Sequence, residues 1–463
     1  MRRPRWLLAI TLLLLTGCTV GPNYQRPAVT VPGEYRGLAP DADKQAAAFA
    51  EEKWWTVFQD EELQKLMRTA LEQNYDLRIA ATRILQAQAV LGITRADQTP
   101  TITGSASAFN QRFPQSLGTP PIETSTLQAS VGLAWELDFW GKFRRATEAA
   151  RADVLATEWG QRAVRTTLVS DVATAYFQLR ELDLELEISK RTLASRQESL
   201  RLVEVRAQGG VTSMLDVRQS EQLVYQAAAA IPDLERRIEQ QENFISVLLG
   251  QNPEPIPRGK ALVDTRIPPT VPAGLPSALL ERRPDIQAAE QQLVAANARI
   301  GVARAAYFPQ ITLTAVGGFQ SSALTSLFTG PAGLWSFGGQ LLQPIFNRGR
   351  IRSNVRLTEA QKQEAVLVYQ STIQQSFREV SDSLIAYRKN QEVREQQSLL
   401  TRAAQDAVQL SDMRYRGGVT SYLEVLDSDT RYFSAQIGLA QAELNERLAM
   451  VQLYRALGGG WEQ

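Results

Sequence analysis

The chain contains two copies of one unit, and this duplication constrains its fold more than any other feature. The segment RAQGGVTSMLDV at 206–217 recurs as RYRGGVTSYLEV at 414–425, an offset of 208 positions. At offsets of 208 and 209, further identical residues align along 60–250 and 276–458. Examples are Leu71 and Leu280, Glu72 and Glu281, Asp76 and Asp285, Gly92 and Gly301, Gly141 and Gly349, and Leu249 and Leu457. We therefore predict two tandem repeats.

A proline-rich stretch joins the two repeats. It covers 251–275, and seven prolines fall between Pro253 and Pro276. Such a composition is typical of an extended linker. Residues 459–463 follow the second repeat as a C-terminal tail.

Each repeat begins with a helical pattern and then changes to strand periodicity. Residues 61–98 lack proline and place apolar and charged residues at helical spacing, which predicts one helix ending at Thr99-Pro100. Pro309 ends its counterpart. Alternation with a period of two then predicts two strands per repeat. They lie at about 101–112 and 126–137, and at about 310–321 and 334–345.

The predicted strands match the 9–11 residues that a tilted strand needs to cross a bilayer. Periodicity alone favours a pair of soluble hairpins. The membrane interpretation depends on the leader described below.

Long helices follow the strands. Residues 142–207 contain no proline and one glycine, Gly160, and a single helix of that length would extend roughly 100 Å at about 1.5 Å per residue. Apolar residues recur every seven positions, which requires a supercoil and a partner helix. They are Val172, Leu179, Leu186, Leu193 and Leu200, then Val217, Val224, Ile231, Ile238 and Ile245.

The repeated turn is predicted to be the tip of an antiparallel helical hairpin. The tips span 207–213 and 415–421. Paired glycines, Gly209-Gly210 and Gly417-Gly418, permit the left-handed conformation that ends a helix. Ser213 with Asp216, and Ser421 with Glu424, match a capping box that begins the next helix.

The first residues have the pattern of a secretion leader. Arg2, Arg3 and Arg5 precede a short apolar stretch, and LTGC ends at Cys18, the only cysteine. This pattern resembles the lipobox of bacterial lipoproteins, which implies a signal peptide at 1–17 and a lipidated N-terminal segment at 18–59. Thr19 after the cysteine implies sorting to the outer membrane.

Composition argues against an enzyme or a nucleic-acid-binding protein. The chain has no histidine and a formal net charge of +1. It therefore lacks the commonest general base and metal ligand, and it has no strongly basic surface. We expect no catalytic residues, no metal site and no cofactor other than the covalent lipid on Cys18.

Four strands per chain are too few to close a barrel. An open sheet edge inside lipid would leave backbone groups unpaired at several kcal/mol each. The strands must therefore close with those of other copies. Two copies would give eight strands and three would give twelve, and residue patterns do not distinguish these alternatives.

Several longer stretches resemble the outer-membrane factor family of TolC-, OprM- and NodT-like efflux channels, particularly its lipoprotein branch. They are CTVGPNYQRP (18–27), WWTVFQDEELQKL (54–66), GLPSALLERRPDIQAAEQQL (274–293), YFPQI (307–311) and PIFNRGRIRSNV (344–355). The resemblance implies a mainly α fold with a transmembrane β-barrel portion. The expected homotrimer has a 12-stranded β-barrel and a 12-helix α-barrel in the outer membrane and periplasm of a Gram-negative bacterium.

The same resemblance implies the function. The channel would passively conduct small, drug-like substrates outward from a periplasmic adaptor protein and an inner-membrane pump of the RND type. The family's periplasmic gate residues fall on Tyr415, Leu423, Glu424 and Asp427. Leu423 would form an apolar constriction, and Glu424 and Asp427 would form acidic rings that select cations. Alternatively, Glu424 is only a helix cap and Asp427 only solvated.

Other functions remain open at this stage. Within the channel class, the alternatives are a type I protein-secretion conduit and a metal-ion efflux channel. A different class is a lipid-anchored coiled-coil scaffold whose strands pair as soluble hairpins. A scaffold would show neither bilayer conductance nor a heat-resistant trimer.

Overall fold

The computed structural model describes residues 19–37, 49, 53–114, 120–264 and 272–461. The chain divides into two units, which share the long helices. The first unit comprises the residues up to Ala28, Arg83–Glu158 and Ala288–Gln370, and the second comprises Val29–Thr82, Trp159–Gln287 and Ser371–Gln463.

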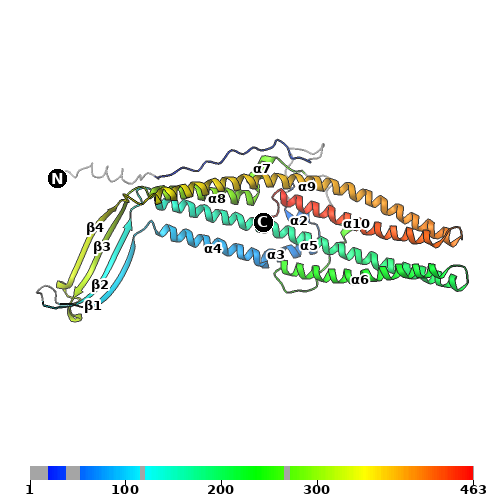
Figure 1. Ribbon diagram of the computed structural model, residues 1–463, viewed down its shortest axis with the longest axis horizontal. Helices are drawn as coiled ribbons and strands as arrows, with labels where there is room; N and C mark the ends of the chain where they lie inside the picture. The colour runs from blue at the N-terminus through cyan, green and yellow to red at the C-terminus, as the bar shows by residue number, and fades with distance from the viewer. Residues whose placement is uncertain (1–18, 38–48, 50–52, 115–119, 265–271, 462–463) are drawn as a thin grey trace. The chain divides into compact units, whose positions relative to one another are not determined.

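The first unit contains one antiparallel sheet of four strands in the order β1-β2-β3-β4 (Figure 1). The strands are β1 (Thr101–Phe113), β2 (Ile122–Glu136), β3 (Gln310–Ser321) and β4 (Gly333–Leu342). β2 begins earlier than predicted, because its polar first residues continue the ladder down to the pair Phe113 and Ile122. β4 ends earlier than predicted, at Leu342, just before Gln343 and Pro344, and proline has no N–H to donate to a ladder.

The sheet exposes large apolar side chains along its length. Trp335 is 84% exposed and Phe337 is 73% exposed on β4, and Ile102 and Val131 are exposed on β1 and β2. The outer sides of β1 and β4 have no strand partner among the described residues. In a single chain in water, this sheet would leave its apolar side chains exposed and its two edge strands unpaired.

The N-terminal residues lie along the helices of the first unit. The backbone N–H of Val20 donates to the carbonyl oxygen of Trp140 at 3.1 Å, and Arg26 pairs with Glu290 of α8 (Pro284–Ala305). The approach is close: a Cβ atom added to Gly301 would lie 2.7 Å from the carbonyl oxygen of Val20. Glycine is therefore required where this segment crosses α8.

The prediction of a single helix over 61–98 is wrong, because this segment forms two helices. α3 (Glu61–Gln73) and α4 (Tyr75–Ala96) are separated at Asn74. The Asn74 side chain accepts a hydrogen bond from the N–H of Leu77 at 3.1 Å, and it donates to the carbonyl oxygen of Leu248 at 2.9 Å. Asparagine therefore begins a new helix and also attaches it to the rest of the second unit. In the second repeat, Pro284 separates α7 (Pro276–Arg282) from α8.

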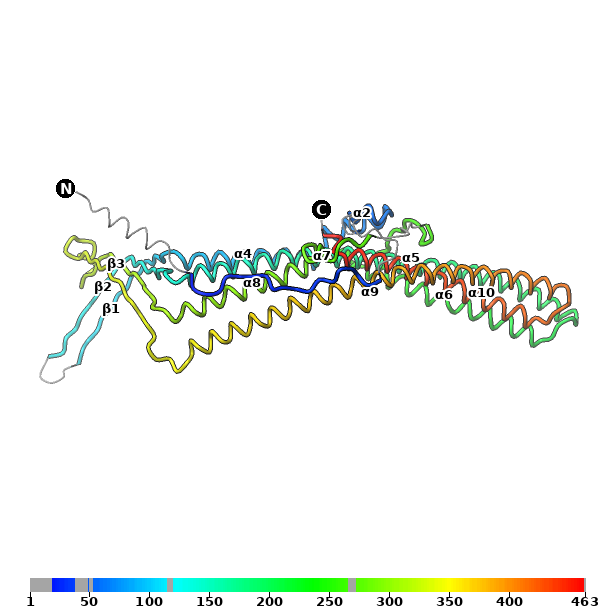
Figure 2. Tube along the Cα trace, turned by 90° about the horizontal axis from the view of Figure 1, so that it is seen from above, coloured from blue at the N-terminus to red at the C-terminus, as the bar shows by residue number. Residues whose placement is uncertain are grey.

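Two helical hairpins dominate the second unit. α5 (Lys142–Gln208) is followed by α6 (Met214–Leu248), and α9 (Arg350–Arg416) is followed by α10 (Tyr422–Ala456). In both views the two helices of each hairpin run side by side to a tight turn (Figures 1 and 2). Within the described residues, no helix combines the length and apolar character needed to cross a membrane.

An aromatic and aliphatic core holds the second unit together. α2 (Trp54–Val57) and α3 pack against α5, α6 and α10 through residues with little or no exposed surface. They include Phe58, Met67, Tyr176, Phe177 and Tyr454. Val172 and Leu179 of the predicted heptad are fully buried in this core, and so is Ile245.

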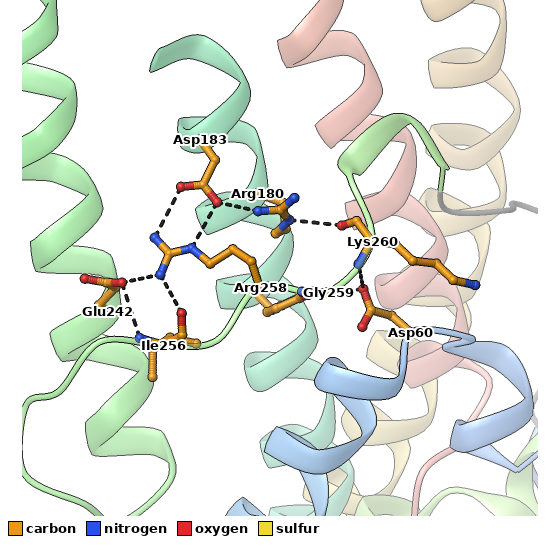
Figure 3. Close-up of polar contacts among 9 residues, drawn as sticks. Asp60, Arg180, Asp183, Glu242, Ile256, Arg258, Gly259 and Lys260 are labelled. Carbon is orange, nitrogen blue, oxygen red and sulfur yellow. Dashed lines mark hydrogen bonds and ion pairs between the residues drawn. The ribbon is translucent and has the colours of Figure 1, made fainter. Parts of the chain in front are cut away.

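The inter-repeat linker is bound to the first hairpin by a polar network (Figure 3). Arg258 forms an ion pair with Asp183 of α5, Nε to Oδ2 at 3.1 Å, and another with Glu242 of α6. The N–H of Lys260 donates to the Asp60 carboxylate at 2.8 Å, and Arg180 donates to the carbonyl oxygen of Lys260 at 3.0 Å. The linker therefore joins α5 and α6 to the start of α3.

Candidate gate at the hairpin tips

Both tips close with the same backbone turn. Gly210 has a φ of 74° and Gly418 a φ of 71°, the left-handed region that only glycine adopts readily. At the first tip, the N–H of Val211 donates to the carbonyl oxygen of Arg206 at 2.9 Å; at the second, Val419 donates to Arg414 at 2.9 Å. These bonds pair carbonyl groups that a helix end would otherwise leave without donors.

The first tip has the predicted capping box. The Ser213 hydroxyl accepts from the N–H of Asp216 at 3.3 Å, and the Asp216 carboxylate accepts from the N–H of Ser213 at 3.1 Å. Partial burial opposes ionisation of Asp216, but hydrogen bonds from Thr212 and Ser213 outweigh it. The pKa of Asp216 is therefore lowered below its ordinary value.

The capping box predicted at the second tip is wrong. Ser421 occupies the N-cap position, but its side chain makes no capping hydrogen bond. The Glu424 carboxylate instead accepts from the Thr420 hydroxyl and pairs with Arg414, Nε to Oε1 at 3.2 Å. The threonine contact is common to both tips, since Thr212 donates to Asp216 in the same way. The differences are that glutamate is one methylene longer than aspartate and that its carboxylate pairs with Arg414. The two tips therefore share a turn but not a cap.

An apolar cluster joins the two hairpins just behind the tips. It consists of Val203 of α5, Val217 of α6, Tyr415 of α9, and Tyr422, Val425 and Leu426 of α10. The rings of Tyr415 and Tyr422 lie 5.0 Å apart, and Tyr415 is only 5% exposed. The hairpins cannot separate here without exposing this cluster to water.

Polar contacts accompany the cluster. The Ser220 hydroxyl of α6 donates to the Tyr422 hydroxyl at 2.6 Å, and the Arg206 guanidinium lies 4.4 Å from the centre of the Tyr415 ring. Burial raises the pKa of the Tyr422 hydroxyl, so it stays protonated. Each contact connects the first hairpin to the second.

The strongest connection is an ion pair that the sequence analysis missed. Arg196 of α5 is buried, and its Nε lies 2.7 Å from Oδ2 of Asp429 on α10. It also donates to the carbonyl oxygen of Leu223 at 2.9 Å and lies over the ring of Phe433. One signal in the sequence could have identified this arginine. Position 196 lies three residues after Leu193 of the heptad and is therefore a second core position, which an apolar residue normally occupies.

The four predicted gate residues have different surroundings. Leu423 is 61% exposed and has no place in the apolar cluster. Asp427 is 59% exposed and pairs with Arg431 one turn further along α10 at 2.7 Å. Tyr415, by contrast, is buried between the hairpins. The structure thus separates an exposed pair, Leu423 and Asp427, from a buried tyrosine that holds the hairpins together.

No metal-binding group emerges at the tips or elsewhere in the described parts of the chain, where no cluster of three potential ligands occurs. Cys18, the predicted lipidation site, lies outside the described residues.

Comparison with known proteins places this chain in a family. The model of the outer membrane efflux protein family matches residues 66–251 and 275–459, and the chain belongs to that family. Its fold is the one predicted: helical, duplicated, and like that of the outer-membrane efflux channels.

Individual relatives are similar over nearly their whole length. The chain is 42% identical over 456 residues to the solvent efflux pump outer membrane protein SrpC of Pseudomonas putida, covering 97% of each chain. It is 36% identical to the cation efflux system protein CusC of Escherichia coli, again covering 97% of each. It superposes on the open state of the MtrE outer membrane channel of Neisseria gonorrhoeae with a TM-score of 0.87 and 31% identity, covering 96% of this chain and 99% of that one.

These findings confirm the predicted class. The protein is an outer-membrane channel of an efflux system in a Gram-negative bacterium. It is a transport conduit and not an enzyme.

Proposed function

We propose that three copies of the chain assemble into one export duct. The observation that carries this proposal is the four-stranded sheet with exposed apolar side chains and two unpartnered edges, β1 and β4. Pairing β1 of one copy with β4 of the next would satisfy every edge. Three copies give a 12-stranded barrel with room for a lumen.

We assign the cargo to small organic molecules, received from a periplasmic adaptor and an RND-type inner-membrane pump. The 42% identity to a solvent efflux protein supports this cargo. Metal-ion export is the second candidate, supported by the 36% identity to a cation efflux protein.

The proposed lipid on Cys18 is supported by the residues that follow it. Thr19 lies against Gly141, where an added Cβ atom would be 2.5 Å from Thr19 Cγ2, and Val20 bonds to the carbonyl group of Trp140. β2 ends at Glu136, only a few residues before this contact. An acyl group on Cys18 would therefore begin near the ends of the strands, where the lipid boundary is expected.

The gate is proposed to be the pair of hairpin tips. In the assembly, three copies of Leu423 would form the apolar constriction, with Asp427 and Glu424 as acidic rings. Opening requires the hairpins of each copy to separate or rotate. The contacts of Tyr415, Tyr422 and Arg196 between the hairpins oppose that movement, so an adaptor must bias the equilibrium.

Single-channel recordings in planar bilayers test this function. Asp427→Ala is expected to reduce cation preference, because it removes three carboxylates from the constriction. Asp233→Ala is the matched control: Asp233 of α6 is 55% exposed and pairs with Arg236 in the same way. Equal cation preference in the two variants would contradict the acidic ring, and absence of any conductance in the wild type would contradict the duct.

A further inference from the structure

A large cavity in the second unit lies apart from the hairpin tips. It measures about 980 Å³ and is lined by α2, α3, α5 and the segment after α10. Its walls carry three tryptophans, Trp54, Trp55 and Trp461, and three arginines, Arg68, Arg162 and Arg165. Nothing in the export mechanism uses this cavity.

Pairs of tryptophan rings form the aromatic wall of the cavity. The rings of Trp54 and Trp55 meet edge to face, 5.3 Å apart, and Trp461 meets Trp159 in the same way at 5.8 Å. Trp54 is 4% exposed, and its indole Nε1 is buried without a hydrogen-bond acceptor among the described residues. Indole N–H groups are normally paired when buried, so this wall of the cavity contains an unpaired donor.

The three arginines are not neutralised. Within the described residues, none of Arg68, Arg162 and Arg165 forms an ion pair. Arg68 is exposed, but Arg162 and Arg165 are half-buried, and most buried or half-buried arginines of this unit do form ion pairs. The Nε atom of Arg165 is buried without an acceptor, and burial lowers the pKa of its guanidinium. Leaving a half-buried cation without a counter-charge is unfavourable, so the cavity favours an anion.

Arg162 is held in place by the aromatic rings. Its guanidinium carbon lies 4.1 Å from the centre of the Trp159 ring and 5.1 Å from that of Trp461. A guanidinium fixed over aromatic faces keeps its N–H edge free for a planar, two-oxygen acceptor. Among the described residues of the lining, Glu72 is the only one with a carboxylate, so their positive charge exceeds their negative charge.

From these contacts we propose that the cavity is a binding site for an organic acid, a carboxylate carried on a flat apolar ring. The carboxylate pairs with the free arginine edges, and the ring packs against the tryptophans. A neutral ring would leave Arg68, Arg162 and Arg165 without a counter-charge, and a cation would be repelled. This site does not depend on the proposed gate.

The test uses the full chain in lipid nanodiscs and isothermal titration calorimetry, with empty nanodiscs as the blank. The probes are 2-naphthoate and its neutral counterpart 2-naphthamide. Naphthoate is expected to bind, and naphthamide to bind about tenfold more weakly or not at all, as for loss of a charge-assisted hydrogen bond. Equal affinity for the two probes would overturn the proposal.

Variants locate the site. Arg165→Gln is expected to weaken naphthoate binding about tenfold and to leave naphthamide unchanged. Arg68→Gln, a substitution at an exposed position, is expected to act in the same direction. Arg191→Gln is the control, an exposed arginine of α5 outside the cavity.

Two results would refute the assignment. The first is that the Arg165 and Arg68 variants both bind naphthoate with the same affinity as the Arg191 control. The other is binding that occurs only after Glu462→Gln. Glu462 lies outside the described residues and follows Trp461 in the sequence, so that result would make the chain's own tail the natural anion.

Discussion

Replacement of Arg196 by methionine should loosen the contact between the two hairpins. Methionine is apolar and similar in length, so it fits the core heptad position while it removes the charge. The change deletes the 2.7 Å ion pair to Asp429, the 2.9 Å hydrogen bond to the carbonyl oxygen of Leu223 and the contact with the Phe433 ring.

The magnitude follows from these contacts. Loss of a hydrogen bond to a charged group costs about 1.5–3 kcal/mol, and loss of the ring contact about 0.5–2 kcal/mol. Two effects offset this loss. Arg196 Nη2 is buried without a partner, so its removal is favourable, and Asp429, 20% exposed, can be partly solvated. We expect the contact between the hairpins to lose about 2 kcal/mol of stability per subunit. This loss would shift the equilibrium between joined and separated hairpins roughly 30-fold toward the separated state.

Two assays detect this change. Single-channel recordings should show a higher open probability, and cells should become sensitive to a large antibiotic that the outer membrane excludes. Arg201→Met is the control, because Arg201 lies on the same helix, is 74% exposed, and pairs only within that helix with Glu198.

A double-mutant cycle sharpens the test. If Arg196→Met acts by leaving Asp429 without its partner, adding Asp429→Asn should restore part of the closed state. If assembled Arg196→Met channels behave like Arg201→Met channels in both assays, the ion pair does not hold the hairpins together.

Three further predictions concern stability, measured as the thermal unfolding of the purified protein. Arg258→Ala should lower the unfolding temperature, because it leaves the carboxylates of α5 and α6 without their shared cation; unchanged unfolding would exclude a structural role for the linker network. Gly418→Ala should destabilise by about 1–2 kcal/mol because of its positive φ, whereas Gly92→Ala, in a helix with open space around it, should stabilise by about 0.5–1 kcal/mol. Burial, with the neighbouring Glu185, raises the pKa of Glu181 to about 8, so the folded state keeps a proton that the unfolded state loses near pH 4.3. Stability should therefore fall as pH rises from about 4.3 to 8, and Glu181→Gln should remove that slope; an equal slope in the variant would contradict the assignment.

Local and periodic signals in the sequence predicted much of this fold. The duplicated turn predicted both hairpin tips, and Gly210 and Gly418 adopt the left-handed conformation expected of them. A stretch without proline predicted α5, and the alternation of apolar residues predicted the strands. These signals are sufficient because helix and strand periodicity, and the glycine requirement of a turn, depend on neighbouring residues alone.

Predictions failed where neighbours in space compete with neighbours in sequence. Asn74 interrupts a helical pattern because its side chain bonds to the distant Leu248 as well as to the next turn. Glu424 has the spacing of a capping residue, yet Arg414 of the preceding helix pairs with its carboxylate. The spacing of residues in the sequence shows which partners a side chain has along its own helix. It does not show which partners approach from other segments.

The sequence by itself therefore determined the repeat, the helix and strand segments and the paired tips, because each is set by residues a few positions apart. Only the tertiary structure determined which charged residues form ion pairs. Arg196 pairs with Asp429 between the two hairpins, and Arg258 pairs with Asp183 and Glu242. Arg165, beside a cavity lined by tryptophans, forms no ion pair within the described part of the chain. Ion pairs and cavities depend on distances between segments far apart in the chain, and these distances are set by packing.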